Sequence, residues 1–264
     1  MRGKRTARLL GVLLALTLTA GLLPMSARAE SVPFDPNEVT IIDVPIPVAG
    51  AQHEAWLYGS GGRIRPNDPL TRAECAEILY RLMTPEAREA LDGGETGFSD
   101  VPDGAWYGQA VLALAQKSVF LGFADGTFRP DEAMTRAEWT AVLSRYLETE
   151  ASAGKSAFSD TAGSWAGAEI AAAAAEGWVR GYPDGTFRPD APVTRAEAAA
   201  TLCRALGRMP GRSGDLLSGM KTWTDNADSS AWYYLILQEA SNSHNFESYT
   251  GSNGKTYEKW TALF

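Results

Sequence analysis

A four-residue motif that occurs three times constrains this chain more than any other feature. The sequence Thr-Arg-Ala-Glu stands at residues 71–74, 135–138 and 194–197, at intervals of 64 and 59 residues. Self-similarity at a nearly fixed period is the signature of a repeat architecture, in which each unit buries its apolar face against its neighbours. We therefore expect one supersecondary unit built three times rather than unrelated domains in series.

Two further elements recur with the motif. The heptapeptide Asp-Gly-Thr-Phe-Arg-Pro-Asp precedes the second and third copies, at residues 125–131 and 184–190. A degenerate copy of it, at residues 62–68, precedes the first. A tripeptide of an aromatic residue, Ser or Thr, and Asp also occurs three times, and a tryptophan that opens an apolar stretch follows each copy. The tripeptides begin at Phe98, Phe158 and Trp223, and the tryptophans are Trp106, Trp165 and Trp232. The predicted unit is a tryptophan helix, a glycine-rich loop and a motif helix.

Both kinds of helix have a local physical basis. Thr as N-cap with Glu three residues on forms a capping box. Apolar residues then recur 7, 8, 11 and 12 positions after each Thr, which defines one buried helix face. We expect the tryptophan helices to run over residues 106–120 and 165–178, with Gly122 and Gly181 as left-handed C-caps. The three tryptophans are expected to pack in the core or against helix ends, with an indole edge that lines a groove.

The order of the elements predicts a mainly α fold with an unusual closure. The chain starts with a motif helix and ends with a tryptophan helix, so its two ends hold the two halves of one unit. A pseudo-threefold bundle of three helix–loop–helix units, circularly closed by the terminal half-units, gives every unit two neighbours. We expect the helix near Trp232 to pack against the helix at Thr71. The predicted boundaries are an extended segment at 30–54 with an edge strand at 39–44, a half-unit at 55–92, units at 93–150 and 153–208, and the closing half-unit at 220–264.

The first 29 residues have the pattern of a signal peptide. Residues 1–8 are basic, residues 9–23 are apolar or small, and Ala27-Arg28-Ala29 offers a small-x-small cleavage site. Without this segment, which holds five basic residues and no acid, the net charge falls from −8 to −13. Nucleic acids and anionic membranes require clustered Lys and Arg. We therefore predict an exported protein that binds no nucleic acid and, after cleavage of the signal, no membrane.

Cysteine and histidine are too scarce to predict a metal or redox site. Cys75 and Cys203 lie at different places in equivalent helices, and disulfide geometry is narrow, so we expect two buried free thiols. His53 and His244 are the only histidines, which argues against a zinc site or a Cys–His nucleophile. Each Asp-Gly loop supplies one acid before its glycine, too few for a calcium loop. No metal, cofactor or catalytic residue is predicted, and we expect no enzymatic activity.

Capping does not explain the arginine of each motif. Arg72, Arg136 and Arg195 occupy the first helical position, where the helix dipole disfavours a cation by up to about 1 kcal/mol. Two interpretations stay open: an internal carboxylate, such as an Asp of the tripeptide or the loop, or an anionic ligand in a groove between units. We expect Arg136 and Arg195 to edge such grooves, so that Arg195→Ala leaves folding nearly intact but weakens ligand binding.

The three correlated elements resemble the S-layer homology domains of exported bacterial proteins. Residues 181–189 followed by the motif at 194–197 are a nearly ideal copy, and the resemblance extends over roughly residues 55–250. The tail at 223–260 resembles the closing half-repeat of clostridial-type members. The resemblance implies a three-pronged helical spindle, on the surface of a Gram-positive type bacterium, that binds secondary cell-wall polysaccharide, often with a pyruvyl ketal. The ligand-binding residues it implies are Arg72, Arg136, Arg195, Gly59, Gly122, Gly181, Trp106, Trp165 and Trp232.

Two alternatives to a wall-binding module stay open. One is a self-assembling structural subunit of a surface layer, and the other is the remnant of a larger exported polysaccharide-active enzyme. Against an enzyme, no paired carboxylates stand out from the acids of caps and turns. Wall binding without turnover, ordered arrays of pure protein and release of reducing sugar distinguish the three.

Overall fold

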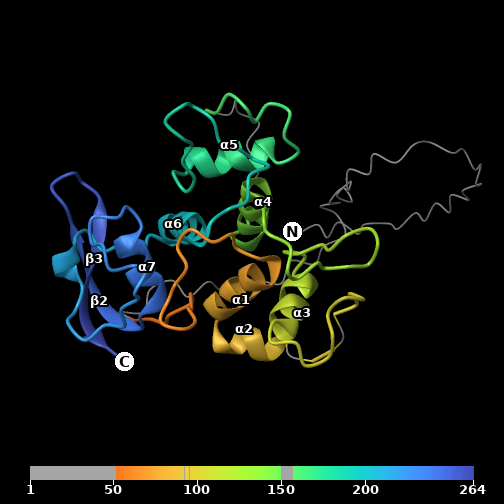
Figure 1. Cartoon of the computed structure of the whole chain (residues 1–264), viewed down its shortest axis with the longest axis horizontal. Helices are drawn as coiled ribbons and strands as arrows, with labels where there is room; N and C mark the ends of the chain where they lie inside the picture. Colours follow the sequence, from red (N-terminus) through yellow and green to blue (C-terminus); the bar gives the residue numbers. More distant parts are fainter. Residues whose placement is uncertain (1–51, 92, 95, 150–156) are drawn as a thin grey trace, which may run out of the picture. The chain divides into compact units, whose positions relative to one another are not determined.

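The predicted helices form, and a small sheet accompanies them (Figure 1). The computed structural model describes residues 52–264 except 92, 95 and 150–156. Its elements are β1 (Gln52–His53), α1 (Arg72–Leu82), α2 (Pro85–Ala90), α3 (Gly108–Gln116), α4 (Arg136–Tyr146), α5 (Gly167–Ala175), α6 (Arg195–Leu206), the 3-10 helix η1 (Ser213–Asp215), α7 (Tyr234–Ser241), β2 (His244–Thr250) and β3 (Thr256–Leu263). The predicted signal peptide at 1–29 and edge strand at 39–44 lie outside the described residues. Within the described ranges, no helix has the length and apolar character needed to cross a membrane.

The three motif helices begin with the predicted capping boxes. Thr71, Thr135 and Thr194 each accept a hydrogen bond from the backbone of the glutamate three residues on, and that glutamate reaches back to the N-cap backbone. Each box satisfies two of the amides that a helix start leaves unpaired. The buried face behind the caps is also confirmed for most of its positions, since the stripe residues of α1 and the leading ones of α4 and α6 are buried.

The tryptophan helices are shorter than predicted. Both α3 and α5 begin two residues after their tryptophan and end before the predicted residues. The tryptophan therefore lies in the turn that precedes its helix. The left-handed residues that follow α3 and α5 are Ser118 and Gly177, with φ of 56° and 76°. The prediction that Gly122 and Gly181 cap these helices is wrong, because both glycines lie further along the loop.

Each motif helix packs against the tryptophan helix of the following repeat. The pairs are α1 with α3, α4 with α5, and α6 with α7 (Figure 1). The main helical neighbour of α7 is therefore α6. The expected neighbour was α1. Contacts between the first and last half-units come from the segments around these helices instead.

The aspartate of each tripeptide holds the loop of a repeat. Asp100 and Asp160 each accept hydrogen bonds from two successive backbone amides in the loop of their own repeat. Asp225, from the last half-unit, accepts the equivalent pair from Ile64 and Arg65 in the first half-unit, both at 2.9 Å. The last half-unit thus supplies the first with the contact that a full repeat makes internally.

Backbone hydrogen bonds also connect the repeats around a common centre. The amide of Leu70 donates to the carbonyl oxygen of Val193, that of Val193 to Met134, and that of Met134 to Leu70, at 2.9, 2.9 and 2.8 Å. Near the chain ends, the amide of Trp56 donates to the carbonyl oxygen of Ala240 in α7 at 3.0 Å. The three hydrogen bonds among Leu70, Val193 and Met134 bond each motif segment to the other two.

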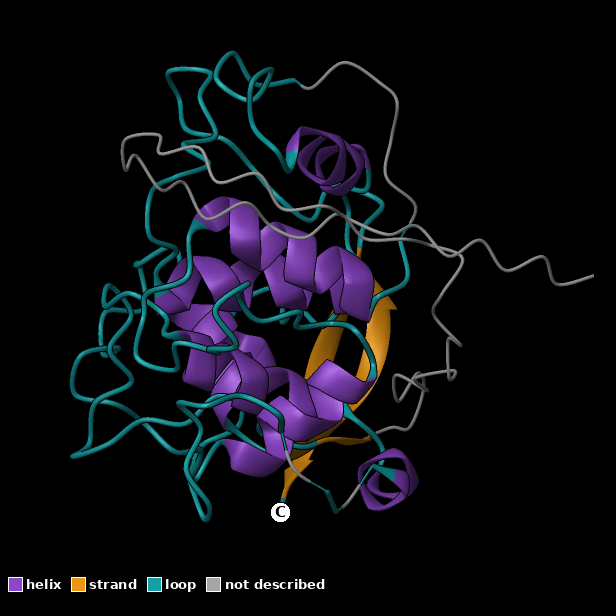
Figure 2. Cartoon of the chain, turned by 90° about the vertical axis from the view of Figure 1, so that its right-hand side faces the viewer, coloured by secondary structure: helices purple, strands orange, loops and turns teal. Residues whose placement is uncertain are grey.

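The last half-unit ends in a β-hairpin that the sequence analysis did not predict. Strands β2 and β3 are antiparallel, and β1 pairs with the other edge of β2, so the sheet order is β1-β2-β3. Figure 2 shows these strands in orange beside the helices. Residues 251–255 form the turn between β2 and β3. The hairpin stands where a full repeat has its loop and motif helix.

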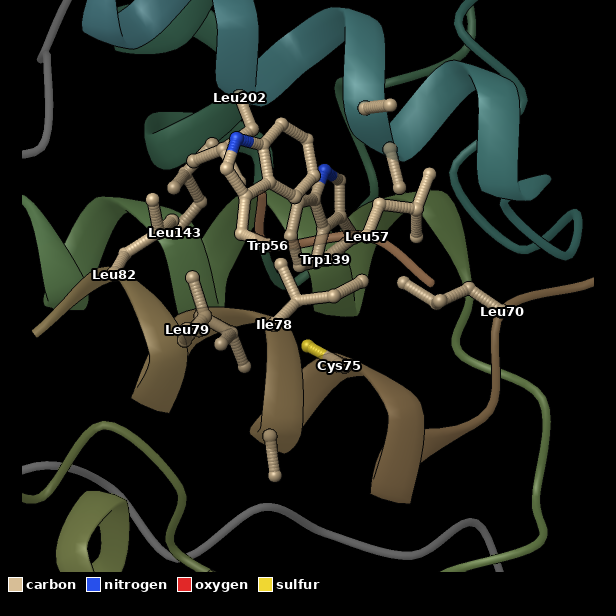
Figure 3. Close-up of a cluster of buried hydrophobic side chains, with 14 of the residues drawn as sticks. Trp56, Leu57, Leu70, Cys75, Ile78, Leu79, Leu82, Trp139, Leu143 and Leu202 are labelled. Carbon is tan, nitrogen blue, oxygen red and sulfur yellow. The ribbon is translucent and has the colours of Figure 1, made fainter. Parts of the chain in front are cut away.

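The largest apolar cluster gathers side chains from all three motif helices (Figure 3). Leu79 of α1, Leu143 of α4 and Leu202 of α6 are each at most 1% exposed. Trp56 and Trp139 belong to the same cluster and are 2% and 1% exposed. Full burial of a large apolar side chain contributes about 1.5–3 kcal/mol, so this shared cluster ties the repeats together.

Both cysteines are buried free thiols, as predicted. Cys75 and Cys203 are 0% exposed and form no disulfide. Burial raises the pKa of both thiols. They are therefore neutral and poor nucleophiles, since the reactive species is the thiolate.

Candidate functional site

Arg195, at the start of α6, is buried and committed to three partners. Its Nε donates to the carbonyl oxygen of Ile64 at 2.9 Å, and one terminal nitrogen donates to that of Tyr58 at 2.7 Å. The other terminal nitrogen donates to the Glu74 carboxylate at 2.8 Å. Glu74 also closes the capping box of α1. One carboxylate therefore caps its own helix and pairs with the arginine of another repeat.

Arg136, at the start of α4, repeats this arrangement. It donates to the carbonyl oxygens of Phe187 and Arg180 at 2.7 and 3.1 Å. It also donates to the carboxylate of Glu197, the capping-box glutamate of α6, at 3.1 Å. In both repeats, the motif arginine therefore donates to two backbone carbonyl oxygens and to the motif glutamate of another repeat.

Arg72, at the start of α1, contacts aromatic rings in place of the carboxylate that Arg136 and Arg195 contact. Its Nε donates to the carbonyl oxygen of Phe128 at 2.7 Å, as in the other repeats. Its guanidinium carbon lies 4.7 Å from the ring centroid of Phe123 and 4.9 Å from that of Phe128. Such cation–π contacts contribute about 0.5–2 kcal/mol each.

These contacts correspond to the internal-carboxylate interpretation for Arg136 and Arg195. The carboxylate is the motif glutamate of the neighbouring repeat, and not an Asp of the tripeptide or the loop. Arg136 and Arg195 each line a pocket, as expected, but the expectation that they stay out of the core is wrong, because they are only 7% and 2% exposed. Because Arg195 is buried and paired, we now expect Arg195→Ala to destabilise the fold, in place of the sequence-based expectation that folding stays nearly intact.

Glu197 is kept ionised by its donors. The Tyr182 hydroxyl donates to the Oε1 that Arg136 also reaches, at 2.8 Å, and the Thr194 amide donates to Oε2 at 2.9 Å. Burial opposes ionisation, but the hydrogen bonds from Thr194 and Tyr182 and the charge of Arg136 outweigh it and lower the pKa of Glu197. A lowered folded pKa means that this carboxylate stabilises the fold above its unfolded pKa of about 4.3, and that the stabilisation is lost as the pH falls through the folded value.

The loop glycines make room for the aromatic residue of the tripeptide. A Cβ atom on Gly181 would lie 2.5 Å from a ring carbon of Phe158 and 2.6 Å from the carbonyl oxygen of Thr186. Gly122 and Gly59 face the corresponding aromatic rings of the other two tripeptides in the same way. Close packing inside the repeat therefore explains why these positions carry glycine.

Gly181→Ala should destabilise the protein by about 1–3 kcal/mol, because the Phe158 ring and the loop backbone must move to admit a methyl group. The matched control is Gly163→Ala, since a Cβ atom there has no neighbour within 4 Å. Its stability should stay within about 0.5 kcal/mol of wild type. Urea denaturation measures both. Equal stability of the two variants would contradict the packing role of Gly181.

The three repeat tryptophans are exposed. Trp106, Trp165 and Trp232 have exposed fractions of 63%, 54% and 57%. The expectation that they pack in the core or against helix ends is wrong, because the helices begin only after them and leave each indole on the preceding turn. Exposed indole faces at equivalent positions are available to stack on a flat ligand.

The larger pocket, here called groove A, lies between α4, α6 and the turn before α7. Its volume is about 160 Å³. Its lining includes Arg136, Trp139, Thr140, Arg180, Gly181, Tyr182, Glu197, Thr201, Arg204 and Trp232. An exposed indole therefore stands beside a set of buried and half-buried polar groups.

Groove A has more cationic than anionic side chains. Three arginines and one glutamate line it, and Arg136 is paired with Glu197. Arg204 donates to the carbonyl oxygen of Trp178 at 3.2 Å, and burial and the nearby charge of Arg180 lower its pKa. Arg180 is exposed, and within the described part of the chain its guanidinium has no hydrogen bond or ion pair. Two uncompensated cations favour an anion between them.

The second pocket, here called groove B, has the same construction but balanced charge. It has a volume of about 130 Å³ and lies between residues 56–58, α1 and Trp106. Its arginines are Arg81 and Arg195, and its acids are Glu74 and Glu77. Arg195 pairs with Glu74, and Arg81 pairs with Glu77 at 2.6 Å. The side-chain charges of groove B therefore cancel.

Both grooves are built from the same parts, which come from three different repeats. Each has the motif arginine of one repeat, the loop and motif helix of a second, and the tryptophan of a third. Five of the nine predicted ligand-binding residues line them: Arg136, Gly181 and Trp232 in groove A, and Arg195 and Trp106 in groove B. Arg72, Gly59, Gly122 and Trp165 line neither.

Arg180 and Arg204 were not among the predicted site residues. Arginine recurs ten residues after each motif threonine, at Arg81, Arg145 and Arg204, so an alignment of the repeats contains the signal for this position. Arg180 belongs to the third repeat alone, because Leu121 stands before the loop glycine of the second. No repeat pattern indicates it.

Comparison with known proteins identifies the repeat. The model of the S-layer homology domain family matches residues 97–138 and 157–199. The chain is 32% identical over 211 residues to a cellulosome-anchoring protein of Acetivibrio thermocellus, which is 78% of this chain and 46% of that protein. It is 30% identical over 152 residues to a surface-layer 125 kDa protein of Lysinibacillus sphaericus, which is 56% of this chain and 12% of that protein.

A relative with an enzyme name also matches. The chain is 37% identical over 145 residues to an amylopullulanase of Thermoanaerobacterium thermosulfurigenes, which is 52% of this chain and 8% of that protein. The chain spans less than half the length of each of these relatives. With two copies of the S-layer homology domain, at residues 97–138 and 157–199, the chain is an S-layer homology domain protein.

Proposed function

We propose that this protein attaches non-covalently to the bacterial cell wall by binding an anionic secondary cell-wall polysaccharide in groove A. The observation that carries the proposal is the excess positive charge of groove A, from Arg180 and Arg204, beside the exposed indole of Trp232. An acidic sugar offers a ring face for stacking and a carboxylate for the guanidinium groups. The protein acts as an anchor without turnover, at the cell surface, as the names of the cellulosome-anchoring and surface-layer relatives suggest.

The groove residues have separate roles. Trp232 stacks on a sugar ring, and Arg180 and Arg204 pair with the carboxylate of the ligand. Arg136 positions the site, because it holds the carbonyl oxygen of Arg180 at 3.1 Å and so fixes the loop that presents the Arg180 side chain. A pyruvyl ketal on the sugar supplies a compact carboxylate that suits a pocket of about 160 Å³.

The proposal includes a circularly closed, pseudo-threefold bundle of three helix–loop–helix units. Three observations support it: the loop clamp that Asp225 provides across the chain ends, the cyclic hydrogen bonds among Leu70, Val193 and Met134, and the construction of groove B. A third groove belongs to this arrangement, with Arg72, Gly122, Arg145 and Trp165 at the corresponding repeat positions.

Arg180→Ala should weaken binding to purified walls roughly 10- to 150-fold, because a charge-assisted hydrogen bond contributes about 1.5–3 kcal/mol. Trp232→Ala should weaken it roughly 2- to 12-fold through lost stacking of about 0.5–1.5 kcal/mol. Both side chains are exposed, so thermal stability should not change. Co-sedimentation with washed wall sacculi, before and after mild-acid removal of pyruvyl ketals, measures the binding.

The matched control is Arg188→Ala. Arg188 is another exposed arginine on the same loop, but it pairs with Asp184 at 2.9 Å and does not line groove A. Equal losses for Arg180→Ala and Arg188→Ala would indicate unspecific attraction and contradict the proposal. Unchanged binding by Arg180→Ala would remove groove A as the site. Release of reducing sugar from the walls would favour an enzyme, and ordered arrays without walls would favour a surface-layer subunit.

A further inference from the structure

Four buried side chains converge where the sheet meets α7. His53 lies on β1, His244 on β2, Glu258 on β3 and Glu239 on α7. Each offers a nitrogen or oxygen atom, and these atoms all lie within 4.8 Å of one another. None of the four lines groove A or groove B. The cluster therefore needs an explanation of its own.

His244 presents an unpartnered nitrogen to the cluster. Its Nδ1 lies 2.9 Å from the backbone carbonyl oxygen of Asn242. A carbonyl oxygen only accepts, so Nδ1 carries the hydrogen and Nε2 of the neutral ring carries the lone pair. This Nε2 lies 3.2 Å from Oε2 of Glu239 and has no hydrogen-bond partner among the described residues, on a side chain that is 0% exposed. A lone pair that faces a carboxylate at this distance requires a cation between them, either a proton or a metal ion.

The spacing of the atoms suits a small tetrahedral ion. Nδ1 of His53 lies 3.0 Å from Oε1 of Glu239 and 3.6 Å from Oε2 of Glu258. Ligand atoms bound to zinc at about 2.0–2.2 Å in a tetrahedron lie about 3.3–3.6 Å from one another. The separations of 3.0, 3.2 and 3.6 Å lie near that range but involve both oxygens of Glu239, and the atoms of the whole set lie within 4.8 Å, so the side chains draw closer together when the ion binds. Oε2 of Glu258 also has no hydrogen-bond partner in the described part of the chain.

The charges of the cluster favour a divalent cation. Glu239 and Glu258 are 1% and 5% exposed, so two carboxylates are buried side by side. Arg208, itself 6% exposed, is the cation whose charge reaches both. One arginine leaves one buried carboxylate without a counter-charge, which is unfavourable in a protein interior.

The surroundings hold these side chains in place. The Trp260 indole nitrogen donates to Oε2 of Glu239 at 3.0 Å, and its ring stacks on His244 with centroids 4.1 Å apart. Phe246 covers His53 with centroids 4.3 Å apart. An outer hydrogen bond on a ligating carboxylate, another on the second histidine nitrogen, and apolar walls are the supports that metal ligands require.

We propose that His53, His244, Glu239 and Glu258 form a structural zinc site. Two imidazole nitrogens and two carboxylate oxygens suit zinc, whereas calcium and magnesium require more oxygen ligands. Four protein ligands complete a tetrahedron, which is the arrangement of a structural and not a catalytic ion. The ion joins β1 to β3 and α7, from opposite ends of the described chain. The sequence analysis expected no zinc because it counted histidines and cysteines, whereas the fold adds two glutamates.

The test starts with the unaltered chain. Protein purified without chelator is analysed by elemental mass spectrometry, and zinc chloride is then titrated into chelator-treated, dialysed protein while thermal unfolding is followed. We expect one zinc per chain and a Tm that rises with zinc but not with magnesium. Cobalt(II) in place of zinc should give the intense visible bands of a tetrahedral complex.

Variants locate the ion. His244→Ala should bind zinc at least about 100-fold more weakly and Glu258→Gln at least about 10-fold more weakly. Glu247→Gln is the matched control, because Glu247 is exposed on β2 and should leave binding unchanged. A wild-type chain that holds no zinc and whose Tm does not respond to zinc would overturn the proposal and leave a proton between His244 and Glu239. Equal zinc affinity of His244→Ala and wild type, or an octahedral cobalt spectrum, would also overturn it.

Discussion

Replacing Arg195 by alanine should lower the free energy of unfolding by about 3–5 kcal/mol, as expected when one member of a buried ion pair is removed. The arginine is 2% exposed and donates to the Glu74 carboxylate and to two backbone carbonyl oxygens. Without it, two carbonyl groups lose their donor and the half-buried Glu74 keeps only Arg65 as a pairing cation, in a place that water reaches poorly. Chemical denaturation followed by circular dichroism measures the loss.

Arg72→Ala is the matched control for Arg195→Ala. Both arginines begin a motif helix, but Arg72 has aromatic faces where Arg195 has Glu74. Its removal should cost less, about 1–3 kcal/mol, because no buried carboxylate is left behind. In Arg195→Ala/Glu74→Ala the two losses should not add, since each single variant already breaks the pair. A cost below about 1 kcal/mol for Arg195→Ala would contradict a stabilising role of the pair.

Asp225→Ala should destabilise the protein by about 2–3 kcal/mol, because charge-assisted hydrogen bonds to two backbone amides are lost together. One of these amides belongs to Ile64, which is 0% exposed, so water cannot replace the carboxylate there. The acceptor comes from the last half-unit and the donors from the first. The loss therefore measures how strongly the last half-unit completes the first. Thermal and urea denaturation of the full chain provide the values.

Asp228→Ala is the control for Asp225→Ala. Asp228 is exposed nearby and bonds only to Ser230 within its own turn, so its removal should leave stability nearly unchanged. An equal loss for both variants would show that the effect is local to the turn and not a property of the joined chain ends.

The cost of Asp225→Ala should depend on pH. Burial raises the pKa of Asp225, but the hydrogen bonds from Ile64 and Arg65 outweigh burial and the pKa is lowered. With a lowered folded pKa, the stabilisation is complete above the unfolded value of about 3.9 and is lost as the pH falls through the folded value. Wild type and variant should therefore differ at neutral pH and converge in acid. A difference that persists unchanged in acid would assign the effect to packing.

The parts of this fold that sequence reasoning predicted are those with a local cause. A capping box requires only a Thr and a Glu three residues apart, so the starts of α1, α4 and α6 were predictable. The buried face of each motif helix follows from its period, and the free thiols follow from their places on those helices. Family resemblance then supplied the domain type, because three motifs recur in a fixed order.

The parts that were not predicted depend on partners far away in the sequence. The motif glutamate already had a role in its own cap, so nothing in the sequence indicated that it also receives the arginine of another repeat. The exposed tryptophans required knowing that α3 and α5 begin two residues late. Arg180 can be recognised as a site residue only when the fold brings it near Arg204. The cluster around His244 can be recognised only when β1 pairs with β2.

Contacts between the chain ends also set the order in which the protein can acquire its structure. The amide of Ile64, in the loop of the first half-unit, needs the carboxylate of Asp225, 161 residues later. The amide of Ala55 needs the hydroxyl of Ser243, 188 residues later. Contacts of such long range form slowly, because loop-closure entropy is lost before they stabilise the chain. A nascent chain therefore cannot complete its first unit until it has been synthesised as far as Ser243.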